Sequence, residues 1–250
     1  EQNVALGQYA LGANTTASNN TAVGHQALLS NTTGGRNVAL GSNALKLYNV
    51  TDSGNDYNVA VGYDALSAAT TAAQNVVVGA LAADALTTAH STTAIGYQAL
   101  SANTTASANT AVGRDALQDN TTGGSNVAVG YRALRDNTTA DRNVAVGASS
   151  MDANTTGANQ TAVGYEALFS NTTGDGNTAL GFRALKSYDG NYNTAVGTSA
   201  LENAITGAAS NVAVGYRAAI QTTTGIQNTA IGREALEANT TGDDAVSVGY

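Results

Sequence analysis

The chain has 250 residues and a composition unlike that of an ordinary globular domain, with 28 Gly, no Pro, Cys or Trp, 5% aromatic and 11% charged residues. Its formal net charge is −8 with only ten Lys and Arg, which argues against a nucleic acid or an anionic membrane surface as partner. The lack of Cys excludes disulfides and thiolate chemistry, and no apolar run reaches the length of a membrane span.

One 17-residue unit recurs along the chain. Fifteen glycines that follow a short aliphatic run mark the unit, and of the fourteen intervals between them eleven are 17 residues, the others being 21, 16 and 18. The unit reads Asn-(Thr/Val)-Ala-Val-Gly-x-x-Ala-Leu-x-x-Asn-Thr-Thr-Gly-x-x, as in Asn126 to Arg142. Such a period is typical of solenoids. It predicts a single repetitive segment over residues 1–250 with no separate globular domain.

Each unit opens with a predicted short β-strand, because Gly lies in the middle of the unit and there is no i, i+3, i+4 apolar stripe to support a helix. In chain order the strands are expected at 3–7, 20–24, 37–41, 58–62, 75–79, 92–96, 109–113, 126–130, 143–147, 160–164, 177–181, 193–197, 211–215, 228–232 and 245–249. The Ala-Leu that starts three residues after the Gly predicts a second strand, and Asn-Thr-Thr-Gly predicts a turn. The expected fold is all-β, a parallel β-solenoid (β-roll) of about fifteen coils.

Side-chain alternation assigns an interior and an exterior to each coil. Ala22 is expected inside with Ala27 and Leu28, whereas Thr21 and Val23 point the other way. An exposed aliphatic column of this length is an association surface of the kind that monomers avoid. It predicts self-association, with a homotrimer as the favoured closed form. The alternative is a wider coil in which both faces are internal.

Asparagine begins the predicted strand in twelve of the fifteen units. In a parallel stack these residues form a ladder whose amides bond from coil to coil, so a structural role is expected. The ladder residues are Asn3, Asn20, Asn37, Asn58, Asn75, Asn109, Asn126, Asn143, Asn177, Asn193, Asn211 and Asn228.

Charged residues avoid the predicted strands and the Ala-Leu positions. They follow the Gly or lie near the turns, and some pairs of opposite sign are one coil apart, such as Glu166 and Arg183. Neighbouring rungs of this kind contribute about 0.2–1 kcal/mol each. This pattern indicates a solvated face that favours one register.

Two irregular loops, 47–57 and 187–192, interrupt the repeat and follow the same Ala-Leu-Lys sequence. Together with the match between 21–34 and 161–174, they indicate a partly duplicated eight-coil block. Loops on rigid scaffolds carry binding residues, and exposed tyrosines beside carboxylates suit sugars. The alternative is an insertion in a tolerant turn. The candidate ligand residues are Tyr48, Asp52, Asp56, Tyr57, Tyr188, Asp189 and Tyr192.

No metal or cofactor is expected, because the segment from Asp52 to Asp56 lacks the length and the terminal Glu of a calcium loop. Asn-Thr-Thr is formally a glycosylation sequon, although turn chemistry alone explains it and the unmodified form is preferred. The sequons begin at Asn14, Asn31, Asn103, Asn120, Asn137, Asn154, Asn171 and Asn239.

Catalysis is not expected, since His25 and His90 fall in different phases of the repeat and no carboxylate pair stands out. The alternatives to a structural role are a carbohydrate-binding or an ice-binding solenoid, the latter through the recurring Thr pairs. A polysaccharide-degrading tailspike is a weaker alternative.

The units Asn109 to Ala116 and Asn193 to Ala200 resemble the head repeats of trimeric autotransporter adhesins (YadA-like), and Gln160 to Gly174 is similar to repeat arrays of phage tail-fibre-like proteins. The resemblance implies a left-handed parallel β-roll with three chains per stalk. It also implies an extracellular fibre on a cell surface or a virion, with a glycan or protein receptor on a host. The 17-residue unit is longer than that of the adhesin heads, and the anchor, stalk and chaperone domain of that family are missing. Bacterial adhesin and viral fibre therefore both stay open, and a piece of a longer fibre is expected.

Overall fold

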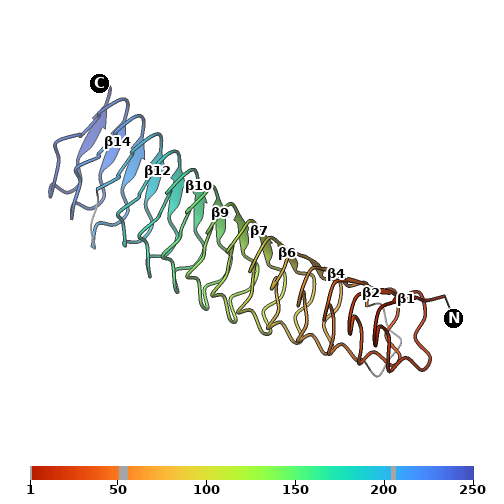
Figure 1. Cartoon of the computed structure of the whole chain (residues 1–250). Helices are drawn as coiled ribbons and strands as arrows, with labels where there is room; N and C mark the ends of the chain where they lie inside the picture. Colours follow the sequence, from red (N-terminus) through yellow and green to blue (C-terminus); the bar gives the residue numbers. More distant parts are fainter. Residues whose placement is uncertain (1, 51–55, 204–206) are drawn as a thin grey trace. The chain divides into compact units, whose positions relative to one another are not determined.

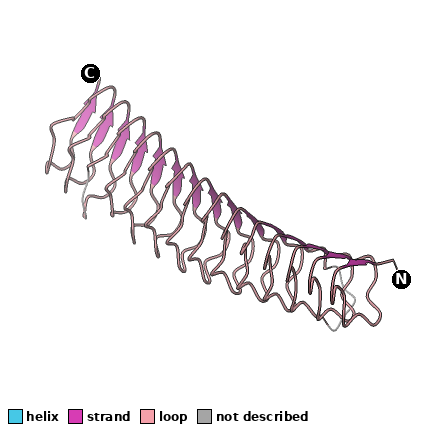
Figure 2. Cartoon of the chain, viewed as in Figure 1, coloured by secondary structure: helices cyan, strands magenta, loops and turns pink. Residues whose placement is uncertain are grey.

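The computed structural model describes residues 2–50, 56–203 and 207–250, which form short strands joined by turns and contain no helix (Figures 1 and 2). The prediction of an all-β parallel β-solenoid is confirmed. Its three-residue strands are β1 (Val4–Leu6), β2 (Thr21–Val23), β3 (Val38–Leu40), β4 (Val59–Val61), β5 (Val76–Val78), β6 (Thr93–Ile95), β7 (Thr110–Val112), β8 (Val127–Val129), β9 (Val144–Val146), β10 (Thr161–Val163), β11 (Thr178–Leu180), β12 (Thr194–Val196), β13 (Val212–Val214), β14 (Thr229–Ile231) and β15 (Val246–Val248).

The coils fall into two compact units, Glu1–Asn126 with β1 to β7 and Val127–Tyr250 with β8 to β15. Within each unit the strands pair in parallel and in chain order. The register places equivalent residues side by side, Ala22 beside Ala39 in the first unit and Ala145 beside Ala162 in the second. Neighbouring coils are therefore about 4.8 Å apart along the stack.

Glycine ends each strand because the backbones of successive coils come too close for a side chain. Gly62 has φ +137°, and a Cβ built there would lie 2.5 Å from the carbonyl oxygen of Gly79. Both the backbone conformation and the close approach require glycine. The marker glycine of the sequence repeat is thus a requirement of the stacking.

The predicted second strand is wrong, since a run of turns follows each Gly. In the second coil Gln26 and Leu28 have φ +58° and +51°. The N–H of Ala27 bonds within its coil to the carbonyl of Gly24 at 3.4 Å, whereas the N–H of Leu28 bonds to Ala44 of the next coil at 3.0 Å. Left-handed backbone in a non-glycine residue costs about 1–2 kcal/mol, which these hydrogen bonds offset. The chain curls tightly here while still presenting Leu28 to the interior.

The predicted interior is confirmed. Ala22, Ala27 and Leu28 are fully buried, as are their equivalents in the middle coils of both units. By contrast, Thr21 and Val23 are only half-buried. The alternative of a wider coil with both faces internal is therefore wrong for these coils, and a small alanine-rich core explains how so few aromatic residues suffice.

Candidate functional site

The outward-pointing first and third residues of the strands form a surface that we call the strand face. In the middle coils of each unit these side chains are half-buried or exposed, with exposed fractions reaching 38% at Ile95, 47% at Leu180 and 41% at Ile231. The middle residue of the same strands is fully buried in these coils. Each strand thus has one dry side and one side open to solvent.

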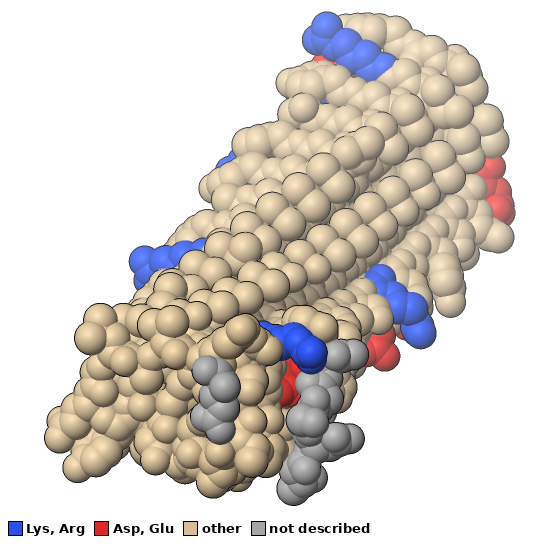
Figure 3. All heavy atoms as spheres, turned by 90° about the vertical axis from the view of Figure 1, so that its right-hand side faces the viewer, with Lys and Arg blue, Asp and Glu red and all other residues tan. Residues whose placement is uncertain are grey.

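The strand face carries no charge. Its first column holds only Thr and Val, and its third column holds only Val, Leu and Ile. Side chains repeat about every 4.8 Å from coil to coil and about 6.6 Å apart within a strand. In the view of Figure 3, wide parts of the surface carry no charged side chain, and the few charged groups lie beside them, several with blue and red groups in contact. An ordered apolar surface of this kind is a candidate interface.

Tyr or Phe follows seven of the fifteen marker glycines, beside the strand face. Six exposed tyrosines occupy this column, namely Tyr63, Tyr97, Tyr131, Tyr165, Tyr216 and Tyr250. Tyr165 stacks on Phe182 with ring centroids 5.6 Å apart, and the Arg233 guanidinium lies 5.6 Å from the rings of both Tyr216 and Tyr250. Phe182 and Arg233 are themselves large residues of this column, so large side chains occupy neighbouring coils along parts of it.

The predicted asparagine ladder is hydrogen-bonded as expected. The backbone N–H of Asn37 donates to Asn20 Oδ1 at 2.9 Å, and that of Asn211 donates to Asn193 Oδ1 at 2.8 Å. The side-chain amides of the ladder also donate hydrogen bonds; for example, Asn20 Nδ2 donates to the Gly34 carbonyl at 2.9 Å. Ladder residues therefore join adjacent coils through hydrogen bonds.

A second asparagine ladder was missed in the sequence. The Asn of Asn-Thr-Thr is fully buried at Asn31, Asn103, Asn120, Asn137, Asn154 and Asn171. Asn120 Nδ2, for example, donates to the Gly123 carbonyl at 2.9 Å, and Asn154 Nδ2 donates to Asn137 Oδ1 at 3.1 Å. A glycan on these six nitrogens is excluded in the folded chain, whereas Asn14 and Asn239 are half-buried.

The first irregular loop does not present its tyrosines as expected. Tyr48 is fully buried, in the phase of the repeat that Asn31 occupies one coil earlier, and burial raises the pKa of its hydroxyl. Asp56 is also buried and accepts a bond from the Gly35 N–H at 2.6 Å. Tyr57 is exposed, with the Arg36 guanidinium 5.6 Å from its ring centroid. Asp52 lies outside the described residues.

The second loop repeats this arrangement. Tyr188 is fully buried and donates to the carbonyl of Ala208, whereas Tyr192 is 68% exposed. Asp189 accepts five hydrogen bonds from the turn of the preceding coil, including those from Thr172 Oγ1 at 2.6 Å and from the Thr173 N–H at 2.8 Å. Although burial opposes ionisation, these bonds hold the pKa of Asp189 below its usual value. The side chains of Tyr48, Tyr188 and Asp189 therefore pack or hydrogen-bond within the coils. They do not form the exposed ligand surface that was predicted.

The charged side of the second unit contains the predicted pair and one buried acid. Arg183 Nε lies 2.9 Å from Glu166 Oε2, as expected from their one-coil separation. Asp152 is buried, with Arg132 Nη2 at 3.1 Å and Arg135 Nε at 3.2 Å. Burial raises the pKa of Asp152 to about 6, against the opposing attraction of Arg135.

The described residues include no group of three or more His, Asp or Glu placed to hold a metal ion. They also form no helix with the length and apolar character of a membrane span. No model of a known protein family matches the chain, and no match is found among curated proteins.

Proposed function

We propose that this chain is a non-catalytic segment of an extracellular structural and adhesive fibre, and that its strand faces join it to further copies of itself in a homotrimer. The observation that carries the proposal is the uncharged, half-exposed strand face, repeated coil after coil in both units. Burying such a surface contributes about 25 cal/mol per Å².

A second copy is the occupant that fits this face best. The third-column residues, such as Val112 and Val163, recur at the coil spacing, and only a surface with the same period matches them over many coils. Charges of either sign lie off the face, so no ion is buried when two faces meet. In a homotrimer, different parts of the strand face contact the two neighbouring copies, and such a heterologous contact closes into a ring when its rotation permits.

The resemblance to adhesin head repeats and to tail-fibre-like arrays supports the same proposal. It adds display outside a cell or on a virion, a left-handed coil and a host receptor of glycan or protein. The bacterial and viral forms share the three-chain assembly, so the association test applies to both.

A matched pair of substitutions tests the association. Val163→Asp places a charge on the strand face, whereas Thr156→Asp places one on an exposed turn residue of the neighbouring coil. Sedimentation velocity is expected to show assembled wild type and Thr156→Asp but monomeric Val163→Asp, with β-type circular dichroism in all three. If both variants assemble equally well, the strand face is not part of the interface.

Ice binding is a second candidate function, and it rests on the exposed threonines of the turns. The second Thr of most pairs is exposed, as at Thr139, Thr156 and Thr173. The first Thr is fixed by a bond to the next coil, such as Thr138 Oγ1 to the Thr155 carbonyl at 3.1 Å. Thermal hysteresis of the wild type that is lost in Thr156→Asp would support it, and its absence in the wild type would exclude it.

A further inference from the structure

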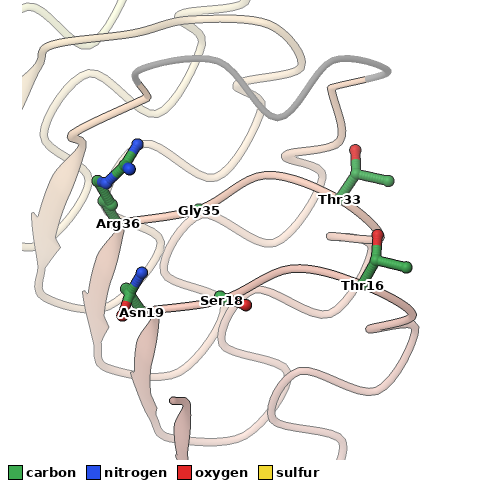
Figure 4. Close-up of a pocket in the computed structure, with 6 residues that line it drawn as sticks. All are labelled: Thr16, Ser18, Asn19, Thr33, Gly35 and Arg36. Atoms are coloured by element: carbon green, nitrogen blue, oxygen red, sulfur yellow. The ribbon is translucent and has the colours of Figure 1, made fainter. Parts of the chain in front are cut away.

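Arginine and tyrosine side chains pair repeatedly on the surface of this chain. The Arg36 guanidinium, at the polar corner shown in Figure 4, lies 5.6 Å from the ring centroid of Tyr57. The Arg114 guanidinium lies 5.8 Å from the ring centroid of Tyr97. Both distances fall within the range of a cation–π contact. A tyrosine ring is therefore a recurring partner of a guanidinium in this fold.

One arginine lies between two rings of the column that follows the marker glycines. In the second unit, three successive coils carry Tyr216, Arg233 and Tyr250 at this position, and the Arg233 guanidinium is 5.6 Å from both ring centroids. Oε1 of Glu234, the next residue, is 3.4 Å from Arg233 Nη2. Two rings that are two coils apart, with a carboxylate beside them, thus hold one guanidinium.

The first unit has the same two rings without the arginine. Tyr63 and Tyr97 are two coils apart at the equivalent position, and both are exposed. Ala80 of the coil between them is half-buried and has a methyl group where Arg233 has its guanidinium. Two coil spacings separate the ring positions by about 10 Å. A flat group midway would lie about 5 Å from each ring, within the range of ring contacts.

The charges around these two rings favour a cation. Residues 58–108, the three coils that contain both rings, include Asp64 and Asp84 but no Lys or Arg. Asp64 follows Tyr63, and a hydrogen bond to this carboxylate raises the pKa of the Tyr63 hydroxyl. A carboxylate thus lies beside the first ring, and no lysine or arginine of these coils competes for it.

The other pair of rings that flanks an alanine differs in charge. Tyr131 and Tyr165 lie on either side of Ala148 in coil order, but Tyr131 is followed by Arg132 where Tyr63 is followed by an acid. The Arg132 guanidinium lies 5.9 Å from the ring centroid of Tyr131. This cation of the chain itself repels a second one. The ring pair of the first unit is therefore the better site for an external cation.

We propose that Tyr63 and Tyr97 bind the guanidinium of an arginine side chain from a partner protein, stacked between the two rings. Asp64 is its carboxylate partner. A guanidinium is flat and always charged, so it gains contacts with two ring faces and a carboxylate at once. The net charge of −8 attracts a basic partner. Use of this contact in adhesion rests on the proposed function, whereas binding of the side chain itself does not.

Titration of the full chain with N-acetyl-L-arginine N-methylamide, followed by saturation-transfer difference NMR, tests the proposal. The citrulline analogue is the comparison, because it has the same shape without the charge. Saturable binding of the arginine compound is expected, roughly threefold tighter than that of the citrulline compound or more. Ala80→Arg, which places a guanidinium of the chain between the rings, is expected to abolish this binding.

Tyr97→Leu is expected to weaken arginine binding roughly threefold or more. Tyr216→Leu is the matched control, because Tyr97 and Tyr216 occupy the same position of the repeat and are both 46% exposed. It should bind as the wild type does, and all variants should keep the wild-type circular dichroism.

The proposal is overturned if the arginine compound does not bind the wild type or if the citrulline compound binds equally well. An equal loss in Tyr97→Leu and Tyr216→Leu would also overturn it. Sedimentation velocity of the same samples measures self-association, so this proposal and the proposed homotrimer can fail independently.

Discussion

Single asparagines carry much of the organisation of each coil. Asn58 accepts the backbone N–H of Asn75 at 3.1 Å and donates to the carbonyl of Ala72 at 2.8 Å, all within a buried site. A buried amide so placed satisfies backbone groups of two coils at once. The same residue type in exposed turns would be replaceable.

Replacing Asn58 with Ala should therefore destabilise the first unit markedly. The change leaves the N–H of Asn75 and the carbonyl of Ala72 unpaired in the interior, and each unsatisfied group costs about 1–3 kcal/mol. Urea unfolding should show a lower midpoint for Asn58→Ala, by about 3 kcal/mol in unfolding free energy. Thr105→Ala, at an exposed turn position, should stay near wild type. Equal midpoints for the two variants would show that the ladder bonds add no stability.

Asp152 gives the second unit a distinctive pH dependence. Its folded-state pKa of about 6 exceeds the unfolded value of about 3.9, so the folded state binds the proton more tightly. The stability associated with this group is then present below about pH 4 and is lost as pH rises through 6.

Asp152→Asn should remove that loss. Between pH 4 and pH 7 the unfolding free energy of Asp152→Asn should rise relative to wild type by on the order of 3 kcal/mol. Urea unfolding at pH 4, 5.5 and 7 measures the difference, with Asp119→Asn at an exposed site as control. If the difference in unfolding free energy between Asp152→Asn and wild type stays constant with pH, the raised pKa of Asp152 is contradicted.

At the scale of the element, the strand and the glycine after it were predictable, whereas the turns were not. Alternation of Thr, Ala and Val and the regular Gly spacing carry enough information for strand position and register. The Ala-Leu segment has a similar alternation, yet its Leu28 adopts φ +51°, and the N–H of Leu28 bonds to Ala44 of the neighbouring coil. A single unit of sequence does not contain that partner.

The burial of two loop tyrosines was not predicted, for a related reason. Tyr48 and Tyr188 each stand three residues after a buried Leu, the phase of Asn31. This position of the repeat predicts a buried side chain only when the Asn of Asn-Thr-Thr, which usually occupies it, is known to be internal. The exposed members, Tyr57 and Tyr192, both immediately precede a ladder asparagine, which is the signal that separates them from the buried pair.

Substitution of a marker glycine tests the stacking of elements. In Gly62→Ala the new Cβ meets the Gly79 carbonyl at 2.5 Å, whereas at Gly249, with a similar φ of +133°, nothing lies within 4 Å. Gly62→Ala should lose β-type circular dichroism or lower the thermal midpoint strongly, and Gly249→Ala, which adds only the backbone strain of its positive φ, should lower it less. Wild-type behaviour of Gly62→Ala would contradict the close approach of the coils.

At the scale of the whole molecule, the composition follows from a thin alanine-rich interior and two different surfaces. One surface is charged or polar and lies around the turns, and the other is the uncharged strand face. A chain with net charge −8 that keeps this face free of charge is suited to association through it.

The solution mass of the unmodified chain tests self-association most directly. Sedimentation equilibrium at micromolar concentration should give three times the 24.9 kDa chain mass. A stable species of one chain mass over the whole concentration range, with the strand face open to water, would contradict the account.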